Sequence, residues 1–198
     1  MGLKRFSEGI EIGCDEAGRG SLSGPVVAAA VVLPKNFYNV DLNDSKKISF
    51  KKRNELSKII YEQSLACEIG IVDVEEIDKI NILNASILAM HKAIEKINLP
   101  FELILIDGPH FKKFKNYNHH CIIRGDSKFL SIAAASIIAK THRDKIMLDL
   151  HEKNPNYKWC RNKGYPTIEH RSAINKFGAS KHHRKSFKLL NKQTALDI

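Results

Sequence analysis

Three apolar runs in the chain each end at a carboxylate, and this repeated ending constrains the fold more than any other feature. The runs are residues 10–14, 103–106 and 121–123, and the carboxylates that follow them are Asp15, Glu16, Asp107 and Asp126. Short apolar runs bounded by glycine, proline or polar residues are typical of β-strands. Binding sites of open α/β sheets form beyond strand ends, where the loops diverge. If the three strands are neighbours, we expect their carboxylates to converge on one site.

Such a carboxylate cluster needs a counter-ion, because carboxylates that lie within a few ångströms repel and one of them is forced to keep its proton. Oxygen ligands suit a hard divalent cation, so we expect Mg²⁺ or Mn²⁺ as the cofactor. Two such ions about 4 Å apart can activate a water molecule and stabilise a leaving oxygen at phosphorus. Taken alone, each acid could instead cap a helix, close a turn or face solvent.

Asp15 and Glu16 raise a geometric difficulty, because adjacent residues of a regular strand point to opposite faces of the sheet. They can share one site only if the strand ends or is distorted there. Gly18 and Gly20 follow closely and would permit such an ending. We therefore expect the first strand to end, or to be distorted, at Asp15 and Glu16.

The remainder of the chain is basic, with 32 Lys and Arg against 22 Asp and Glu, a net charge of +10 and a pI near 9.4. Nucleic acid and an anionic membrane both suit this charge, although a basic protein can also lack a polyanionic partner. The apolar stretch 25–33 is too short to span a bilayer, and residues 1–13 lack the apolar centre of a secretory signal. We expect a soluble, cytoplasmic monomer without a membrane partner.

The cysteines and the remaining periodic segments complete the expected organisation. No two of the four cysteines form a C-x-x-C pair, so neither a zinc site nor a redox motif is expected. Asp73 and Glu76 resemble a capping box that begins a short helix. We further expect helices over about 49–63, 83–97, 131–153 and 166–178, a strand over 65–72, and a loop over 110–120. This order predicts an α/β fold, a mixed sheet flanked by helices with a helical C-terminal part from about residue 155, in one domain over residues 1–198.

The glycine-rich segment 18–24 does not match a dinucleotide-binding loop. Ser23 stands where the third glycine of G-x-G-x-x-G would be, and a strand-like Val/Ala run follows where a helix would be needed. Its backbone groups could still approach a sugar or a phosphate closely.

Several sequence motifs resemble those of a known family, ribonuclease HII. The motifs occur in the family's order over nearly the whole chain: residues 15–20, 24–33, 44–47, 125–127, 131–140, 143–144, 163–167 with His170, and 183–187. The resemblance implies a ribonuclease H-like fold. It also implies hydrolysis of RNA/DNA hybrids and cleavage 5′ to ribonucleotides embedded in duplex DNA, leaving 3′-hydroxyl and 5′-phosphate ends, as in ribonucleotide repair and replication.

The resemblance also implies residue roles. Asp15, Glu16, Asp107 and Asp126 would be the metal-binding catalytic carboxylates, the same four residues that the strand ends single out. The remaining implied positions would bind substrate: Gly18, Arg19 and Gly20 at the 2′-hydroxyl, Tyr165 at the neighbouring deoxyribose, and Lys46 and Lys47 at phosphates. A 2′-hydroxyl is the group that distinguishes RNA from DNA at such a site. Ser21 and Ser23 depart from the family's usual Pro and Ala.

Two other functional classes remain open, a non-catalytic nucleic-acid-binding protein and another metal-dependent nuclease of the same fold. The first would not need four acids at strand ends, and the second would not need the Gly-Arg-Gly loop with Tyr165. We expect Arg143 and Asp144 to form a structural ion pair. The histidine pairs at 119–120 and 182–183 are expected to face solvent or phosphate.

Overall fold

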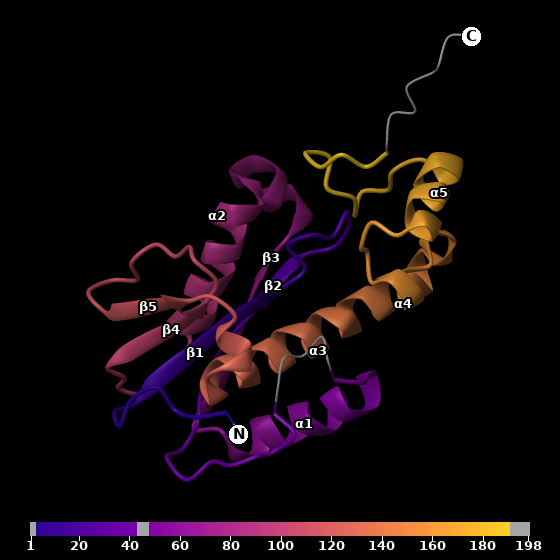
Figure 1. Cartoon of the computed structure of the whole chain (residues 1–198). Coiled ribbons are helices and arrows are strands. Elements are labelled where there is room, and N and C mark those ends of the chain that lie inside the picture. Colours follow the sequence, from indigo (N-terminus) through magenta and orange to yellow (C-terminus); the bar gives the residue numbers. More distant parts are fainter. Residues whose placement is uncertain (1–2, 43–47, 191–198) are drawn as a thin grey trace.

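The structure is a computed structural model that describes residues 3–42 and 48–190. Its centre is a sheet of five strands with the order β3-β2-β1-β4-β5 (Figure 1). The strands are β1 (Glu11–Ala17), β2 (Val26–Val32), β3 (Ala66–Val72), β4 (Leu103–Asp107) and β5 (Asn118–Ile122). β1, β2 and β3 are antiparallel, whereas β1, β4 and β5 are parallel. The predicted mixed sheet is therefore confirmed.

Helices cover both faces of this sheet. Helix α2 (Val74–Glu95) packs on one face, and α1 (Phe50–Gln63) and α3 (Leu130–Lys153) pack on the other (Figure 1). The contact between β1 and α3 is close, because a Cβ atom on Gly13 would lie 2.1 Å from the backbone of Ser131. A side chain at this position would push α3 off the sheet.

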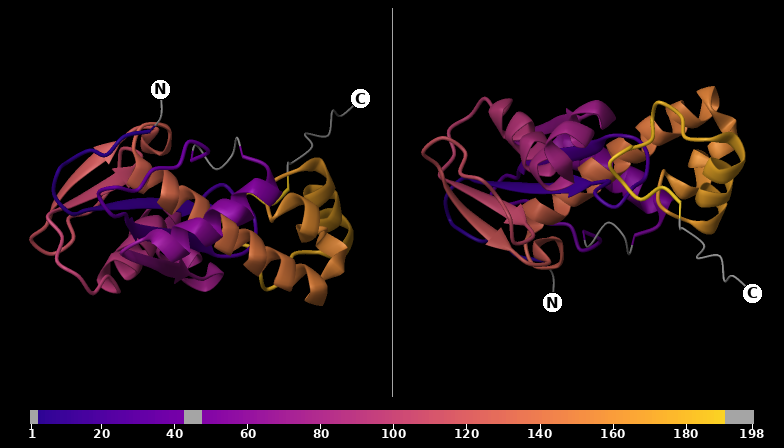
Figure 2. Two further views of the ribbon diagram at one scale, coloured as in Figure 1. Left: turned by 90° about the horizontal axis from the view of Figure 1, so that it is seen from below. Right: turned by 90° about the horizontal axis from the view of Figure 1, so that it is seen from above.

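The C-terminal part lies beyond the end of α3, at the opposite end of the molecule from β4 and β5 (Figure 2). It contains two short helical turns, η2 (Pro155–Tyr157) and α4 (Trp159–Asn162), and the helix α5 (Ile168–Phe177). α5 confirms the helix expected over about 166–178: Thr167 caps its start, and Gly178, with a φ of 76°, stands at its end. The buried side chain of Trp159 anchors this part, together with Leu22 and Met147.

Three details differ from the sequence-based expectations. β5 begins at Asn118, inside the expected loop, because its backbone pairs with β4 although its side chains are polar. Asp73 stands at the start of α2 without a side-chain capping bond, so the capping box is wrong. α2 is interrupted at Asn81, where φ is 65°, and the Asn81 side chain accepts hydrogen bonds from the backbone N–H groups of Leu83 and Asn84, which restart the helix.

None of the helices in the described ranges is both long enough and apolar enough to cross a membrane.

Candidate active site

The strand register brings Asp15 and Asp107 next to each other. The β1–β4 ladder pairs Cys14 with Ile106, and the next positions along the two parallel strands are Asp15 and Asp107. Both lie on the α3 face, since Gly13 of β1 touches α3 while Ile106 of β4 packs towards α2. Asp15 is only 5 % exposed.

Burial and neighbouring like charges both act on the carboxylate of Asp15. Burial raises the pKa of Asp15 well above its ordinary value, and the charges of Glu16 and Asp107 raise it further. Hydrogen bonds from the Ser136 side chain on α3 and from the Glu16 backbone N–H oppose this rise, the latter with an N–O distance of 2.6 Å. The carboxylate of Asp15 therefore lies where added positive charge would be strongly stabilising.

Glu16 lies on the other face of the sheet, because the first strand does not end where we expected. β1 continues to Ala17 in register with β2, which provides paired backbone on that side, and Glu16 is opposite Ala28 of the α2 face. Its carboxylate is 3.2 Å from the guanidinium of Arg19. The predicted strand ending is wrong, although Glu16 is close enough to shift the pKa of Asp15.

Asp126 is placed by the turn that follows β5. The carboxylate of Asp107 accepts a hydrogen bond from the backbone N–H of Gly125, with an N–O distance of 2.7 Å. This bond fixes the short helical turn η1 (Gly125–Ser127), whose central residue Asp126 is 5 % exposed. Asp107, at the end of β4, is thus linked to Asp126, in η1, through the backbone of Gly125.

The donor set suits a divalent cation, although it does not form a preassembled cage. In the ranges 3–42 and 48–190, no three His, Cys, Asp or Glu side chains are arranged as ligands of one ion. The fit rests on chemistry: a buried carboxylate beside two further carboxylates is destabilised by repulsion that a hard cation removes.

The glycine-rich loop lies beside this site, and one side of it packs against Arg143. A Cβ atom on Gly18, whose φ is +100°, would lie 2.1 Å from the guanidinium of Arg143, whereas one on Gly20 would meet no heavy atom within 4 Å. Arg19 and Gly20 are exposed. The loop therefore has a packed underside and an open face.

Two fully buried arginines bind the carbonyl groups of this loop. Arg143 donates to the carbonyl oxygens of Ser23, Pro25 and Lys163 at 2.9–3.0 Å. Arg184 donates to those of Gly24 and Arg19, also at 2.9–3.0 Å. Among the residues that the structure describes, both guanidiniums donate their hydrogen bonds to neutral carbonyl oxygens, so positive charge remains beneath the loop. Burial together with the charge of Arg143 lowers the pKa of Arg184 to about 9.

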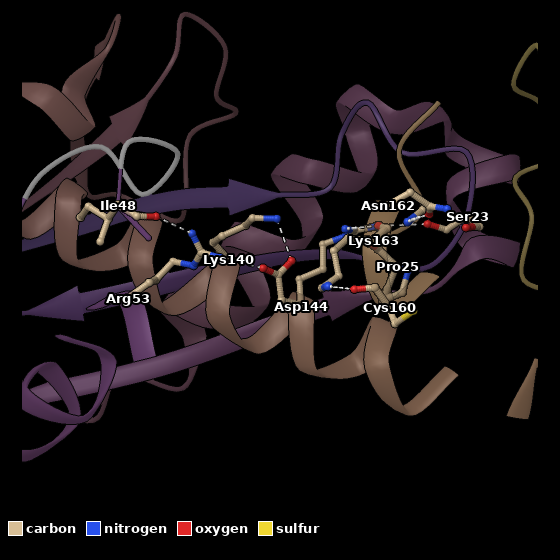
Figure 3. Close-up of polar contacts among 11 residues, drawn as sticks. Ser23, Pro25, Ile48, Arg53, Lys140, Asp144, Cys160, Asn162 and Lys163 are labelled. Carbon is tan, nitrogen blue, oxygen red and sulfur yellow. Dashed lines mark hydrogen bonds and ion pairs between the residues drawn. The ribbon is translucent and has the colours of Figure 1, made fainter. Parts of the chain in front are cut away.

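The expected Arg143–Asp144 ion pair is wrong. Asp144 contacts Arg53 at 3.0 Å and Lys140 at 2.7 Å. These contacts lie apart from Ser23 and Lys163, whose carbonyl groups Arg143 binds (Figure 3). Adjacent helical residues do not face each other, which is the physical reason. Arg53, Lys140, Arg161 and Lys163 line a surface groove of about 490 Å³.

Tyr165 lies at the same junction as the glycine-rich loop. The backbone N–H of Leu22 donates to the carbonyl of Gly164 at 2.8 Å, and the Leu22 carbonyl accepts from the N–H of Arg184 at 2.8 Å. The Tyr165 ring centroid is 5.4 Å from Arg143 Cζ. We call these three segments, residues 18–25, 162–165 and 182–184, the loop junction.

The outcome for the other sequence-predicted residues is mixed. Lys46 and Lys47 lie outside the described residues. His183 is fully buried, so the expectation that it faces solvent or phosphate is wrong. Sequence reasoning also missed that Arg184 supports the loop, since a histidine and an arginine in a basic segment carry no periodic signal of burial. All four cysteines are free thiols, and Cys121 is exposed.

A family model and a curated relative identify one family, and solved structures share the fold. A family model described as ribonuclease HII matches residues 12–190. A ribonuclease HII from Christiangramia forsetii is 54% identical over 186 residues, covering 94% of each chain. The solved PCNA:RNase HII complex from Archaeoglobus fulgidus is similar with a TM-score of 0.76, 25% identity, and coverage of 93% of this chain and 98% of that one. Bst-RNase HIII in complex with Mn²⁺ has a TM-score of 0.71 at 20% identity, covering 91% of this chain and 67% of its own.

Proposed function

The chain belongs to the ribonuclease HII family and is therefore a ribonuclease H endonuclease, and on that premise we propose how it acts. It hydrolyses the RNA strand of RNA/DNA hybrids and cuts 5′ to ribonucleotides embedded in duplex DNA, leaving 3′-hydroxyl and 5′-phosphate ends. One observation carries the proposal: the buried carboxylate of Asp15, beside Asp107, lies close to a glycine-rich loop whose open face is free to meet a nucleic acid.

The carboxylates would hold the metal. Asp15, Asp107 and Asp126 would bind Mg²⁺ or Mn²⁺, and Glu16 would complete the set by turning away from Arg19 round the end of β1. Two ions would suit four acids. Such ions supply a more acidic water and positive charge for the developing negative charge at phosphorus. The Ser136 hydroxyl holds Asp15, and the Gly125 N–H holds Asp107, so that both carboxylates stay oriented. The Mn²⁺ of the Bst-RNase HIII complex supports this choice of ion.

The loop junction would read the substrate. The backbone of Gly18, Arg19 and Gly20 would contact the 2′-hydroxyl, and Tyr165 would stack on the neighbouring deoxyribose. Backbone contacts recognise a ribose without reading its base, so we expect little sequence preference. The exposed loop face and the position of Tyr165 beside Arg143 support this role.

Basic side chains would hold the phosphates of the duplex. Lys46 and Lys47 are proposed phosphate contacts, and the groove lined by Lys140 and Lys163 lies next to Tyr165. Lys140 Nζ is 5.3 Å from the centre of the tyrosine ring. Phosphate contacts release counterions, so affinity for the hybrid should fall steeply with salt.

We propose that residues 1–198 act as one catalytic unit, a cytoplasmic monomer that removes ribonucleotides from DNA and serves replication. The single unit is supported by the loop junction, which joins residues of the sheet end to residues of the C-terminal helical part.

The test is cleavage of a labelled duplex with a single ribonucleotide, beside an all-DNA duplex of the same sequence, with Mg²⁺ or Mn²⁺ and with a chelator. We expect metal-dependent nicking 5′ to the ribonucleotide and an intact control duplex. The Asp15→Asn variant should lose about a hundredfold or more in rate while still binding the hybrid. Asp149→Asn, at an exposed position of α3, is the matched control and should cut normally.

Two outcomes would contradict the proposal. Cutting of both duplexes would indicate a nuclease without ribonucleotide recognition. Full turnover by Asp15→Asn would remove Asp15 from the metal site.

A further inference from the structure

A chain of hydrogen bonds between buried rings runs through the C-terminal part. The side chains of Trp159, His170 and His183 are all fully buried. His170 Nε2 is 3.0 Å from the indole nitrogen of Trp159 and 3.2 Å from Nε2 of His183. None of these three rings is among the groups proposed to bind the metal or to contact the substrate.

The donors at the two ends of the chain determine where every hydrogen lies. The backbone N–H of Ser180 donates to Nδ1 of His183 at 3.0 Å, so a neutral His183 carries its hydrogen on Nε2 and donates it to His170. The indole N–H of Trp159 can only donate, and it also points at Nε2 of His170. The hydrogen of His170 must therefore lie on Nδ1.

This assignment makes His170 a donor to Tyr165. Nδ1 of His170 is 3.0 Å from the carbonyl oxygen of Tyr165, which also accepts from the backbone N–H of Thr167 at 2.8 Å. Adding a proton to either imidazole would place two hydrogens in one contact, and burial accordingly lowers the pKa of His170 and that of His183. Both rings are thus kept neutral in the arrangement that holds the Tyr165 backbone.

We propose that His170 is a positioning residue for Tyr165: with His183 and Trp159 fixing its orientation, it anchors the Tyr165 backbone and so sets the place of the aromatic ring beside the glycine-rich loop. This inference rests on the proposed contact between Tyr165 and the substrate. A shift of the ring by about 1 Å would slow cleavage more than it weakens binding, because duplex affinity comes mainly from phosphate contacts.

Two substitutions at position 170 separate positioning from packing. His170→Asn keeps an amide N–H near the place of Nδ1 and so keeps a donor to Tyr165. His170→Gln keeps a polar group near the place of Nε2, facing Trp159 and His183, and loses the donor to Tyr165. Asn175→Gln, at an exposed position of α5 outside the loop junction, is the control and should cut normally.

The measurement is kcat and KM on the duplex with one ribonucleotide, together with the melting temperature of each variant. We expect His170→Gln to lose about tenfold or more in kcat with KM changed less than about threefold, and His170→Asn to stay within about threefold of the unaltered protein. In a Tyr165→Ala background, His170→Gln should add less than about a twofold loss.

The outcomes distinguish this inference from the proposed function. If His170→Gln keeps its kcat, or if both variants lose kcat in proportion to their melting temperatures, the positioning role is wrong while the nuclease function stands. If Tyr165→Ala cuts normally and Asp15→Asn does not, the substrate role of Tyr165 and this inference both fail. If Asp15→Asn also cuts normally, the proposed active site itself is wrong.

Discussion

The carboxylate end of the sheet and the loop junction are built by different means. Backbone register places Asp15 beside Asp107, through a ladder of regular pairs. The loop junction depends on side chains that reach carbonyl groups far away in sequence, such as Arg184 binding the carbonyl of Arg19, 165 positions earlier. The carboxylate end is therefore held by many repeated backbone hydrogen bonds, whereas the loop junction depends on a few individual side chains.

The two regions also contain like charges of opposite sign. Burial raises the pKa of Asp15 and the charges of Glu16 and Asp107 raise it further, while burial together with Arg143 lowers the pKa of Arg184. A nucleic acid with bound cations would relieve both, since its phosphates suit the junction and the cations suit the carboxylates. The comparison teaches that each region stores like-charge repulsion that the proposed substrate complex would remove.

The largest test of this contrast is Arg184→Lys. Lysine keeps the charge but cannot bind both Gly24 and Arg19 through a planar fork, so the carbonyls of the loop lose their partners. We expect a loss of about 3 kcal/mol in the free energy of unfolding, measured by urea denaturation. Arg161→Lys, at an exposed surface pair, should change it by less than about 0.5 kcal/mol. Equal effects would show that the junction does not depend on the guanidinium.

This division also explains what could be predicted from the sequence. The carboxylates and the mixed sheet follow from apolar runs and their endings, because these are local and periodic. The continuation of β1 through Glu16 could not be foreseen, since it depends on β2 supplying paired backbone on that side. The burial of His183 depends on its packing with Trp159 and His170, and the basic sequence around His183 does not predict that packing.

Acid should affect the two regions with opposite sign. Burial lowers the pKa of His183 to about 4, so the neutral ring stabilises the folded state fully above pH 6.5. As the pH falls towards 4 the unfolded chain takes up the proton first, and the free energy of unfolding should fall by about 2 kcal/mol by pH 5. The pKa of Asp15 is raised, so the folded state takes up its proton first and acidification stabilises that end.

Asp15→Asn separates the pH-dependent contribution of Asp15 to stability from that of His183. The amide removes the repulsion at pH 7, so this variant should melt higher than the unaltered protein there. It also removes the gain on acidification, so it should lose more stability between pH 7 and pH 5. Melting curves at both values measure this, and parallel pH dependence would contradict the raised pKa of Asp15.

The test with the smallest expected effect compares one serine-to-alanine substitution in each region. Ser23 Oγ is buried and has no hydrogen-bond partner among the residues that the structure describes, so Ser23→Ala should stabilise the protein by about 0.5–1 kcal/mol. The Ser136 hydroxyl bonds Asp15, so Ser136→Ala should destabilise it by about 1 kcal/mol. Urea denaturation of both variants measures the difference, and a shift of the same sign in both would undo the contrast.

The bonds from Arg184 to the glycine-rich loop have a consequence for synthesis. They join residues 160 and 165 positions apart, so they form only after nearly the whole described chain has left the ribosome. The sheet strands with Asp15 and Asp107 are complete much earlier. A growing chain thus has its acids in place before its loop is supported, and the recognition of a ribonucleotide that we propose for the loop would be the last property it acquires.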